Sequence, residues 1–254
     1  MLRRFSEFKN FALAARDGEI GKVKELYFDD QNWNVRYVVV DTGGWLHGRK
    51  VLIAPHTLGM IDSQSELIAV HLNRAQVEDS PSIDTEKPVT RLYEEEWHRY
   101  YDYPAYWLIP EAVGFASPPL MPETTLHEPQ RKGGASLAES HYNPNLRSSK
   151  EVTGYAIHAI DGDIGHVADY IIDEDGWAIR YVVISLSRWT GKDLLISPEW
   201  IERICWDDEH VYVPLMRVTI REAPVWDDSE PITREFENRL FEHYGRPGYW
   251  PIEL

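Results

Sequence analysis

The chain has 254 residues, and its 26 basic and 42 acidic side chains give a formal charge of −16. A chain this acidic is repelled by nucleic-acid phosphates and by anionic membrane surfaces, so we expect no nucleic acid among its partners. With 43% hydrophobic and 27% charged residues it has the composition of a globular protein, and its length allows two domains. It has no apolar stretch of membrane-spanning length and no apolar core of a secretory signal near its start, so we predict a cytoplasmic location with no transmembrane segment.

The segment from Gly18 to Gly43 returns in closely similar form from Gly162. Ten residues recur unchanged 144 positions later: Gly18, Ile20, Gly21, Val23, Asp29, Trp33, Arg36, Tyr37, Val38 and Val39. The second copy then loses one residue, and the offset stays at 143 to the end of the repeat. A register held this long indicates a duplicated domain. We predict domains at 1–107 and 146–254, joined by a Pro-, Gly- and Ser-rich linker at 108–145.

Each copy has the pattern of a β domain. The Asp-Gly pairs at Asp17 and Asp161 predict hairpin turns between apolar runs. In the first copy we expect strands at Ile20–Phe28, Val35–Asp41, Val51–Ala54 and Leu67–Leu72. Several short strands in so few residues predict a small β-barrel, because closure removes exposed sheet edges.

A helical arm is expected after each β region. Apolar residues recur every four positions at Val89, Tyr93, Trp97 and Tyr101, and again at Ile232, Phe236, Leu240 and Tyr244. Pro88 and Pro231 suit the first helical position, and Gly245 should end the second helix. We expect each arm to pack across a pseudo-twofold onto the opposite barrel, with a partner surface as the alternative.

The order of these signals resembles the PRC-barrel domain, a family named after the cytoplasmic part of the H subunit of the purple bacterial photosynthetic reaction centre. The signals are Asp-Gly, Ile-Gly-x-Val, an acidic turn, Trp-x-x-Arg-Tyr-Val-Val and a later Leu-Ile-x-Pro, and they occur twice. The segment from Leu146 to Ala159 is similar to the opening of stand-alone bacterial proteins with two such domains. The resemblance implies a mainly β fold of two tandem small PRC-type β-barrels in a pseudo-twofold arrangement, each followed by a short helix and an aromatic tail. It also implies a scaffold that binds other proteins, with no catalytic residues to carry over.

Two sets of residues stand out in the duplicated motifs. We interpret Trp33, Arg36 and Tyr37, with Trp177, Arg180 and Tyr181, as structural, and we expect each arginine to pair with a carboxylate or a turn carbonyl. The aromatic tails are different, because they exceed what one small barrel needs. Their last members are therefore candidate partner-binding residues: Tyr106, Trp107, Tyr249 and Trp250.

From the sequence we assign no catalytic, cofactor-binding or metal-binding residues. The acidic turns Asp29-Asp30 and Asp173–Asp175 are interpreted as solvated hairpin tips, with Ca²⁺ binding left as the alternative. The ten histidines show no zinc-ligand spacing. Cys205 has no visible partner that would activate it as a nucleophile.

Three functional hypotheses follow from these observations. The leading one is a non-enzymatic scaffold that binds a protein of unknown identity. The alternatives are an accessory of a photosynthetic or other electron-transfer complex, and a small-molecule sensor or enzyme with a cleft between the barrels. Oligomeric state stays open, with a homo-oligomer among the alternatives.

Overall fold

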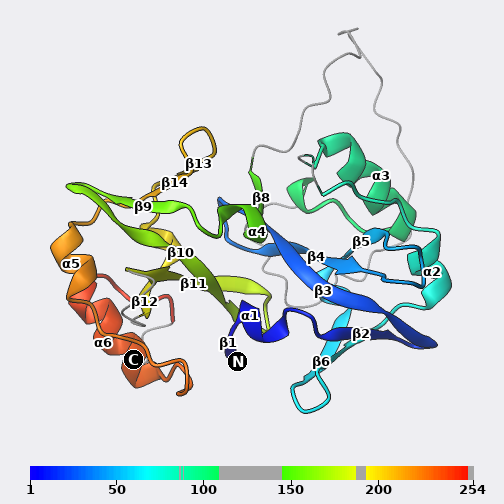
Figure 1. Ribbon diagram of the computed structural model, residues 1–254, viewed down its shortest axis with the longest axis horizontal. Helices are drawn as coiled ribbons and strands as arrows, with labels where there is room; N and C mark the ends of the chain where they lie inside the picture. Colours follow the sequence, from blue (N-terminus) through cyan, green and yellow to red (C-terminus); the bar gives the residue numbers. More distant parts are fainter. Residues whose placement is uncertain (86, 88, 109–144, 187–192, 251–254) are drawn as a thin grey trace, which may run out of the picture. The chain divides into compact units, whose positions relative to one another are not determined.

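The computed structural model describes residues 1–85, 87, 89–108, 145–186 and 193–250. The chain divides into two compact units, one made of Met1–Ile83 with Asn145–Leu254 and the other of Asp84–Pro144. The first unit contains two seven-stranded sheets, one for each repeat (Figure 1). The prediction of a mainly β fold is therefore confirmed.

The two sheets share one topology. In the first sheet the order is β5-β4-β3-β2-β7-β6, from Lys50–Ile53, Val35–Asp41, Gly18–Asp29, Ala12–Ala15, Leu67–Val70 and Leu58–Asp62. In the second the order is β12-β11-β10-β9-β14-β13, from Asp193–Ile196, Ala178–Ser185, Gly162–Asp173, Ala156–Ala159, His210–Tyr212 and Arg203–Cys205. Among the described residues each order has two ends, so the hydrogen-bonded ladder does not close on itself.

Short helices lie between these strands, or directly before the first or after the last of them. In the first repeat they are α1 (Phe5–Phe8), η1 (Pro55–Thr57) and α2 (Arg74–Glu78), and in the second α4 (Ser149–Val152), η3 (Pro198–Trp200) and α5 (Arg217–Arg221). The helix of each arm is longer, and the second arm lies in the same unit as the sheets.

The Ile-Gly motif is explained by a close approach of two backbones. Gly21 has a φ of 151°, and a Cβ placed on it would lie 2.2 Å from the carbonyl oxygen of Asp41 on β4. At the equivalent Gly165 a Cβ would lie 2.5 Å from the carbonyl oxygen of Ser185 on β11. Only glycine permits this contact, so both copies keep it.

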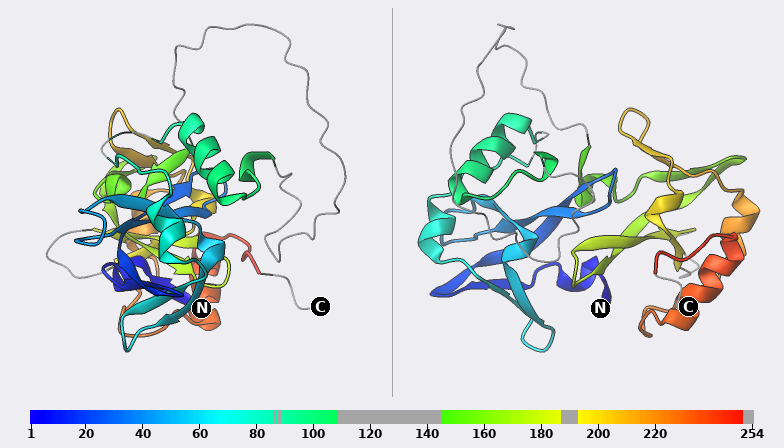
Figure 2. Two further views of the ribbon diagram at one scale, coloured as in Figure 1. Left: turned by 90° about the vertical axis from the view of Figure 1, so that its right-hand side faces the viewer. Right: turned by 180° about the vertical axis from the view of Figure 1, so that it is seen from behind.

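Each repeat gives its first strand to the sheet of the other repeat. Strand β1 (Leu2–Arg4) pairs antiparallel with β10 of the second sheet, and β8 (Leu146–Ser148) pairs antiparallel with β3 of the first (Figures 1 and 2). The two pairings are equivalent, since Leu2 lies opposite Asp173 and Leu146 opposite Asp29. The sequence analysis did not anticipate this exchange.

A second reciprocal contact joins the turns that carry the duplicated tryptophans to the strands that follow them. The amide of Val35 donates to the carbonyl of Trp177, and the amide of Ile179 donates to the carbonyl of Trp33, both at 2.8 Å. Both tryptophans have left-handed backbone, with φ of 55° for Trp33 and 50° for Trp177. This uncommon conformation turns each carbonyl toward the other repeat.

The second arm helix, α6 (Arg234–Tyr244), begins later than we expected. The hydroxyl of Thr233 accepts a hydrogen bond from the amide of Phe236 at 3.2 Å and so caps the helix, whereas Pro231 lies before the cap. The prediction that Pro231 occupies the first helical position is therefore wrong. Gly245, with a φ of 62°, ends the helix as predicted.

The same helix packs on its own repeat. Its predicted apolar face is buried at Phe236, Leu240 and Tyr244. Trp200, which follows β12 in the same repeat, lies 4.5 Å from Tyr244 and 5.0 Å from Phe241 between ring centroids. The expected packing onto the opposite barrel is therefore wrong for this arm. Its helix packs against aromatic side chains of its own repeat instead.

The unit Asp84–Pro144 contains the first arm. Its helix α3 (Arg91–Tyr101) is capped by Thr90, whose hydroxyl accepts from the amide of Tyr93 at 3.1 Å, and η2 (Tyr106–Leu108) follows. Pro88 and positions 109–144 of the predicted linker lie outside the described residues.

Candidate functional site

A groove of about 660 Å³ lies where the two repeats exchange strands. We call it the junction groove. Its walls are the turn Asp30–Asn34, the start of β8 at Arg147, the start of β11 at Arg180, the segment Ser197–Ile204 and Tyr249. Both repeats therefore contribute to it, and its lining carries charges of both signs.

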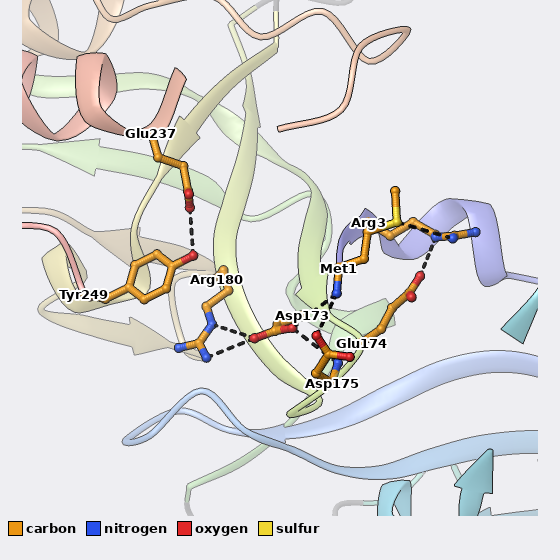
Figure 3. Close-up of polar contacts among 8 residues, drawn as sticks. All are labelled: Met1, Arg3, Asp173, Glu174, Asp175, Arg180, Glu237 and Tyr249. Atoms are coloured by element: carbon orange, nitrogen blue, oxygen red, sulfur yellow. Dashed lines mark hydrogen bonds and ion pairs between the residues drawn. The ribbon is translucent and has the colours of Figure 1, made fainter. Parts of the chain in front are cut away.

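One wall is fixed by an ion pair that depends on the strand exchange. Arg147 on β8 lies 2.5 Å from the carboxylate of Asp30, and its guanidinium lies 4.7 Å from the ring centroid of Trp206. Burial raises the pKa of Asp30, and the charge of Arg147 opposes that rise. At the other exchanged strand, Arg3 lies 2.5 Å from Glu174, the equivalent pair of residues (Figure 3).

The spacing between the acidic turn and the arginine of the Trp-x-x-Arg-Tyr motif is the same in both repeats. In each repeat these residues form an ion pair. Arg36 lies 2.8 Å from Asp29 in the first repeat. In the second repeat Arg180 lies 3.1 Å from Asp173 (Figure 3). The expectation that each arginine pairs with a carboxylate is confirmed. Since arginines engage these turn carboxylates, the geometry favours a structural role over Ca²⁺ binding.

The six residues interpreted as structural lie at the interface between the repeats or in the core. Tyr37 and Tyr181 are buried on β4 and β11, and Trp33 is buried after β3. Trp177 is half-buried, with its ring centroid 6.3 Å from that of Phe8.

The aromatic tail of the second arm closes over a buried carboxylate. Glu237 on α6 accepts a hydrogen bond from the hydroxyl of Tyr181 at 2.6 Å. It accepts another from the hydroxyl of Tyr249 at 2.7 Å (Figure 3). Arg234 lies 3.0 Å from the second oxygen of Glu237 and stacks 4.1 Å from the ring centroid of Trp250. Tyr249 thus reaches the junction groove with its hydroxyl held in place.

The first arm has the same arrangement at the equivalent positions. The hydroxyl of Tyr106 donates to Glu94 at 2.7 Å, Arg91 lies 3.1 Å from Glu94, and Arg91 stacks 4.1 Å from the ring centroid of Trp107. The structure therefore brings Tyr106 and Trp107 together in one unit, and Tyr249 and Trp250 in the other. All four rings are half-buried.

We predict that Tyr249 ionises at unusually high pH. Burial, and then the hydrogen bond to Glu237, raises its pKa from 10.0 to about 12. A raised pKa means that the fold favours the neutral phenol, so its contribution to stability is complete below pH 10 and is lost as pH approaches 12. Tyrosinate absorbance compared between wild type and Tyr249→Phe measures this group, and Glu237→Gln should move its ionisation downward. Ionisation near pH 10 would contradict the geometry.

A cluster that the sequence analysis missed lies on the second sheet. His158, Asp163 and His210 are brought together by neighbouring strands, with potential ligand atoms all within 4.8 Å of one another. The sequence spacing gave no signal, because β9 and β14 are adjacent only through the parallel pairing of the folded sheet.

The two sheets have the same topology, and their residues correspond at a nearly constant offset along the chain. The protein is therefore a duplicated β protein. Residues 2–73 match the family model of the PRC-barrel domain, so the resemblance is confirmed for the first repeat. The second repeat is related to it by the internal duplication. A comparison with curated proteins finds no match. Among the described residues, no helix has the length and apolar character needed to cross a membrane.

Proposed function

We propose that the chain is a non-enzymatic scaffold of two PRC-barrels in a pseudo-twofold arrangement, and that it binds a protein partner at the junction groove. The observation that carries this proposal is the groove itself, which both repeats build and which holds fixed charges of both signs. The reciprocal contacts of Trp33 and Trp177 support the pseudo-twofold relation. A cytoplasmic location stays a prediction.

The chemistry of the lining favours a protein over a metabolite. Small-molecule pockets are mostly apolar with few polar groups, whereas protein interfaces are rich in arginine and tyrosine and have polar rims. Arg147, Arg180 and Tyr249 line the groove in defined orientations, and Glu199 and Glu202 lie exposed at its side. No histidine or cysteine is among the described lining residues, so a hydroxyl there lacks the usual activating base.

We expect a reversal of charge in the groove to abolish capture of the partner. The variant Glu199→Arg/Glu202→Arg changes two exposed side chains of the lining, so the fold should be unaffected. As a matched control, Glu235→Arg/Glu242→Arg makes the same change of charge on the exposed face of α6. In pull-downs from the native host, a protein recovered by wild type and control should fall at least tenfold with the groove variant. Equal recovery by both variants, or no specific protein with wild type, would refute the proposal.

A small-molecule sensor is the second candidate function, because a volume of about 660 Å³ is in the range of ligand pockets. A thermal-shift screen with nucleotides and metabolites tests it, using the same groove variant. A shift that the variant removes would favour the sensor. The accessory role in electron transfer rests on the family resemblance alone, and a non-phototrophic host would count against its photosynthetic form.

A further inference from the structure

Three strands of the second sheet place His158, Asp163 and His210 on one face. Asp163 on β10 is the antiparallel partner of His158 on β9. His210 on β14 is the parallel partner of Ala156, which lies two residues before His158 and so on the same face. Pairing between strands, rather than a flexible loop, therefore sets the spacing of the three side chains.

The distances between these side chains suit a shared cation. Nδ1 of His158 lies 2.7 Å from Oδ1 of Asp163, and Nε2 of His210 lies 3.6 Å from the same oxygen. Ligand atoms of a tetrahedral zinc ion lie about 3.4 Å apart, given metal–ligand bonds of about 2.1 Å. The observed spacing brackets this value, and the side chains are exposed enough to adjust and to admit an ion.

The contact of His210 with Asp208 determines which ring nitrogen presents a lone pair to the carboxylate of Asp163. Nδ1 of His210 contacts the backbone carbonyl of Asp208, where only an N–H donor makes a hydrogen bond. In the neutral ring Nε2 then carries the lone pair, and it is directed at Asp163. Two acceptors facing each other repel, and a cation bound between them would relieve this repulsion. Fixing one imidazole nitrogen by a carbonyl is also how metal-binding histidines are oriented.

Among the described residues, Arg203 does not supply that cation, because it is engaged by a tyrosine ring. Arg203 lies over the ring of Tyr212, 3.9 Å from its centroid, and the hydroxyl of Tyr212 donates to the carboxylate of Asp208. The carboxylate of Asp208 lies 3.6 Å from Nδ1 of His210, on the side of the ring that faces away from Asp163.

The first repeat lacks the same ligands. The positions equivalent to His158, Asp163 and His210 are Ala14, Glu19 and Leu67, by the offsets of the duplication. The backbone pairing is the same in both repeats. Ala12 is the parallel partner of Leu67, and the equivalent Ala156 is the parallel partner of His210. The cluster is thus a property of the second repeat rather than of the shared fold.

We propose that His158, Asp163 and His210 form a surface site for a divalent transition-metal ion, with zinc as the expected occupant. Two imidazoles and one carboxylate supply three ligands, and a tetrahedral ion keeps its fourth position for water. This site is separate from the junction groove, so its test is independent of the proposed function.

Calorimetric titration of the full chain with ZnCl₂ should show one site per chain, and Co²⁺ should give the visible absorption of a low-symmetry complex. His210→Ala and the isosteric Asp163→Asn should each weaken binding at least tenfold. His71→Ala, an exposed histidine in the first repeat, is the matched control and should bind as wild type. Melting curves without metal verify that each variant is folded. No zinc binding by wild type, or binding by His210→Ala and Asp163→Asn as tight as that of wild type, would overturn the proposal.

Discussion

Replacing Trp33 with alanine is expected to lower the free energy of unfolding by about 3–5 kcal/mol, the usual cost of removing a buried tryptophan. Trp33 is 7% exposed, and its ring stacks on Phe28 with centroids 5.2 Å apart. Phe28 in turn lies 5.6 Å from Tyr170 of the other repeat, so the cavity would open at the interface of the repeats. Urea unfolding measures the loss.

Trp177→Ala is the comparison within the same protein. It removes the equivalent side chain, but Trp177 is only half-buried, so we expect a smaller loss of stability. The structural interpretation of these residues would fail if both variants unfolded as wild type does while capture of a protein partner disappeared.

Local sequence patterns predicted the central strands well. The run Val35–Asp41 is the strand β4 with the same bounds, and the turn after Asp29 follows β3 as expected. β-Branched runs and Asp-Gly turns determine structure through neighbours in the chain, so they can be recognised without the fold. The Arg–carboxylate pairs belong to the same class, because Asp29 and Arg36 flank a single turn.

The strand exchange could not be predicted in this way. Leu2–Arg4 and Leu146–Ser148 are three residues each, too short for a periodicity, and both pair with strands of the other repeat. The metal-site candidate has the same origin, since His158 and His210 meet only through the register of a parallel pair. Thr233 shows a local competition, in which the capping hydroxyl rather than Pro231 determines where α6 begins.

Arg4→Ala is expected to destabilise the second sheet even though Arg4 belongs to the first repeat. The guanidinium lies 2.8 Å from Asp169, 2.9 Å from Asp193 and 3.3 Å from Asp228. Asp169 is 6% exposed, so the substitution leaves a buried carboxylate without its cation. Breaking a buried pair by removing one partner costs about 3–5 kcal/mol. Hydrogen exchange of the β10 and β11 amides should show faster opening of the second sheet.

The equivalent exchange offers a rescue, since Ser148 occupies the position of Arg4 and donates to Glu25, the equivalent of Asp169, at 2.5 Å. The double variant Arg4→Ser/Asp169→Glu copies this neutral donor and longer carboxylate onto the β1–β10 pairing. We expect it to recover part of the stability that Arg4→Ala loses, while Arg4→Ser alone should not. Unchanged protection of the second sheet in Arg4→Ala would mean that the ion pairs of Arg4 do not stabilise this sheet. Recovery by the double variant would instead show that the two junctions are interchangeable, because the same backbone pairing tolerates either an ion pair or a hydroxyl–carboxylate hydrogen bond at its centre.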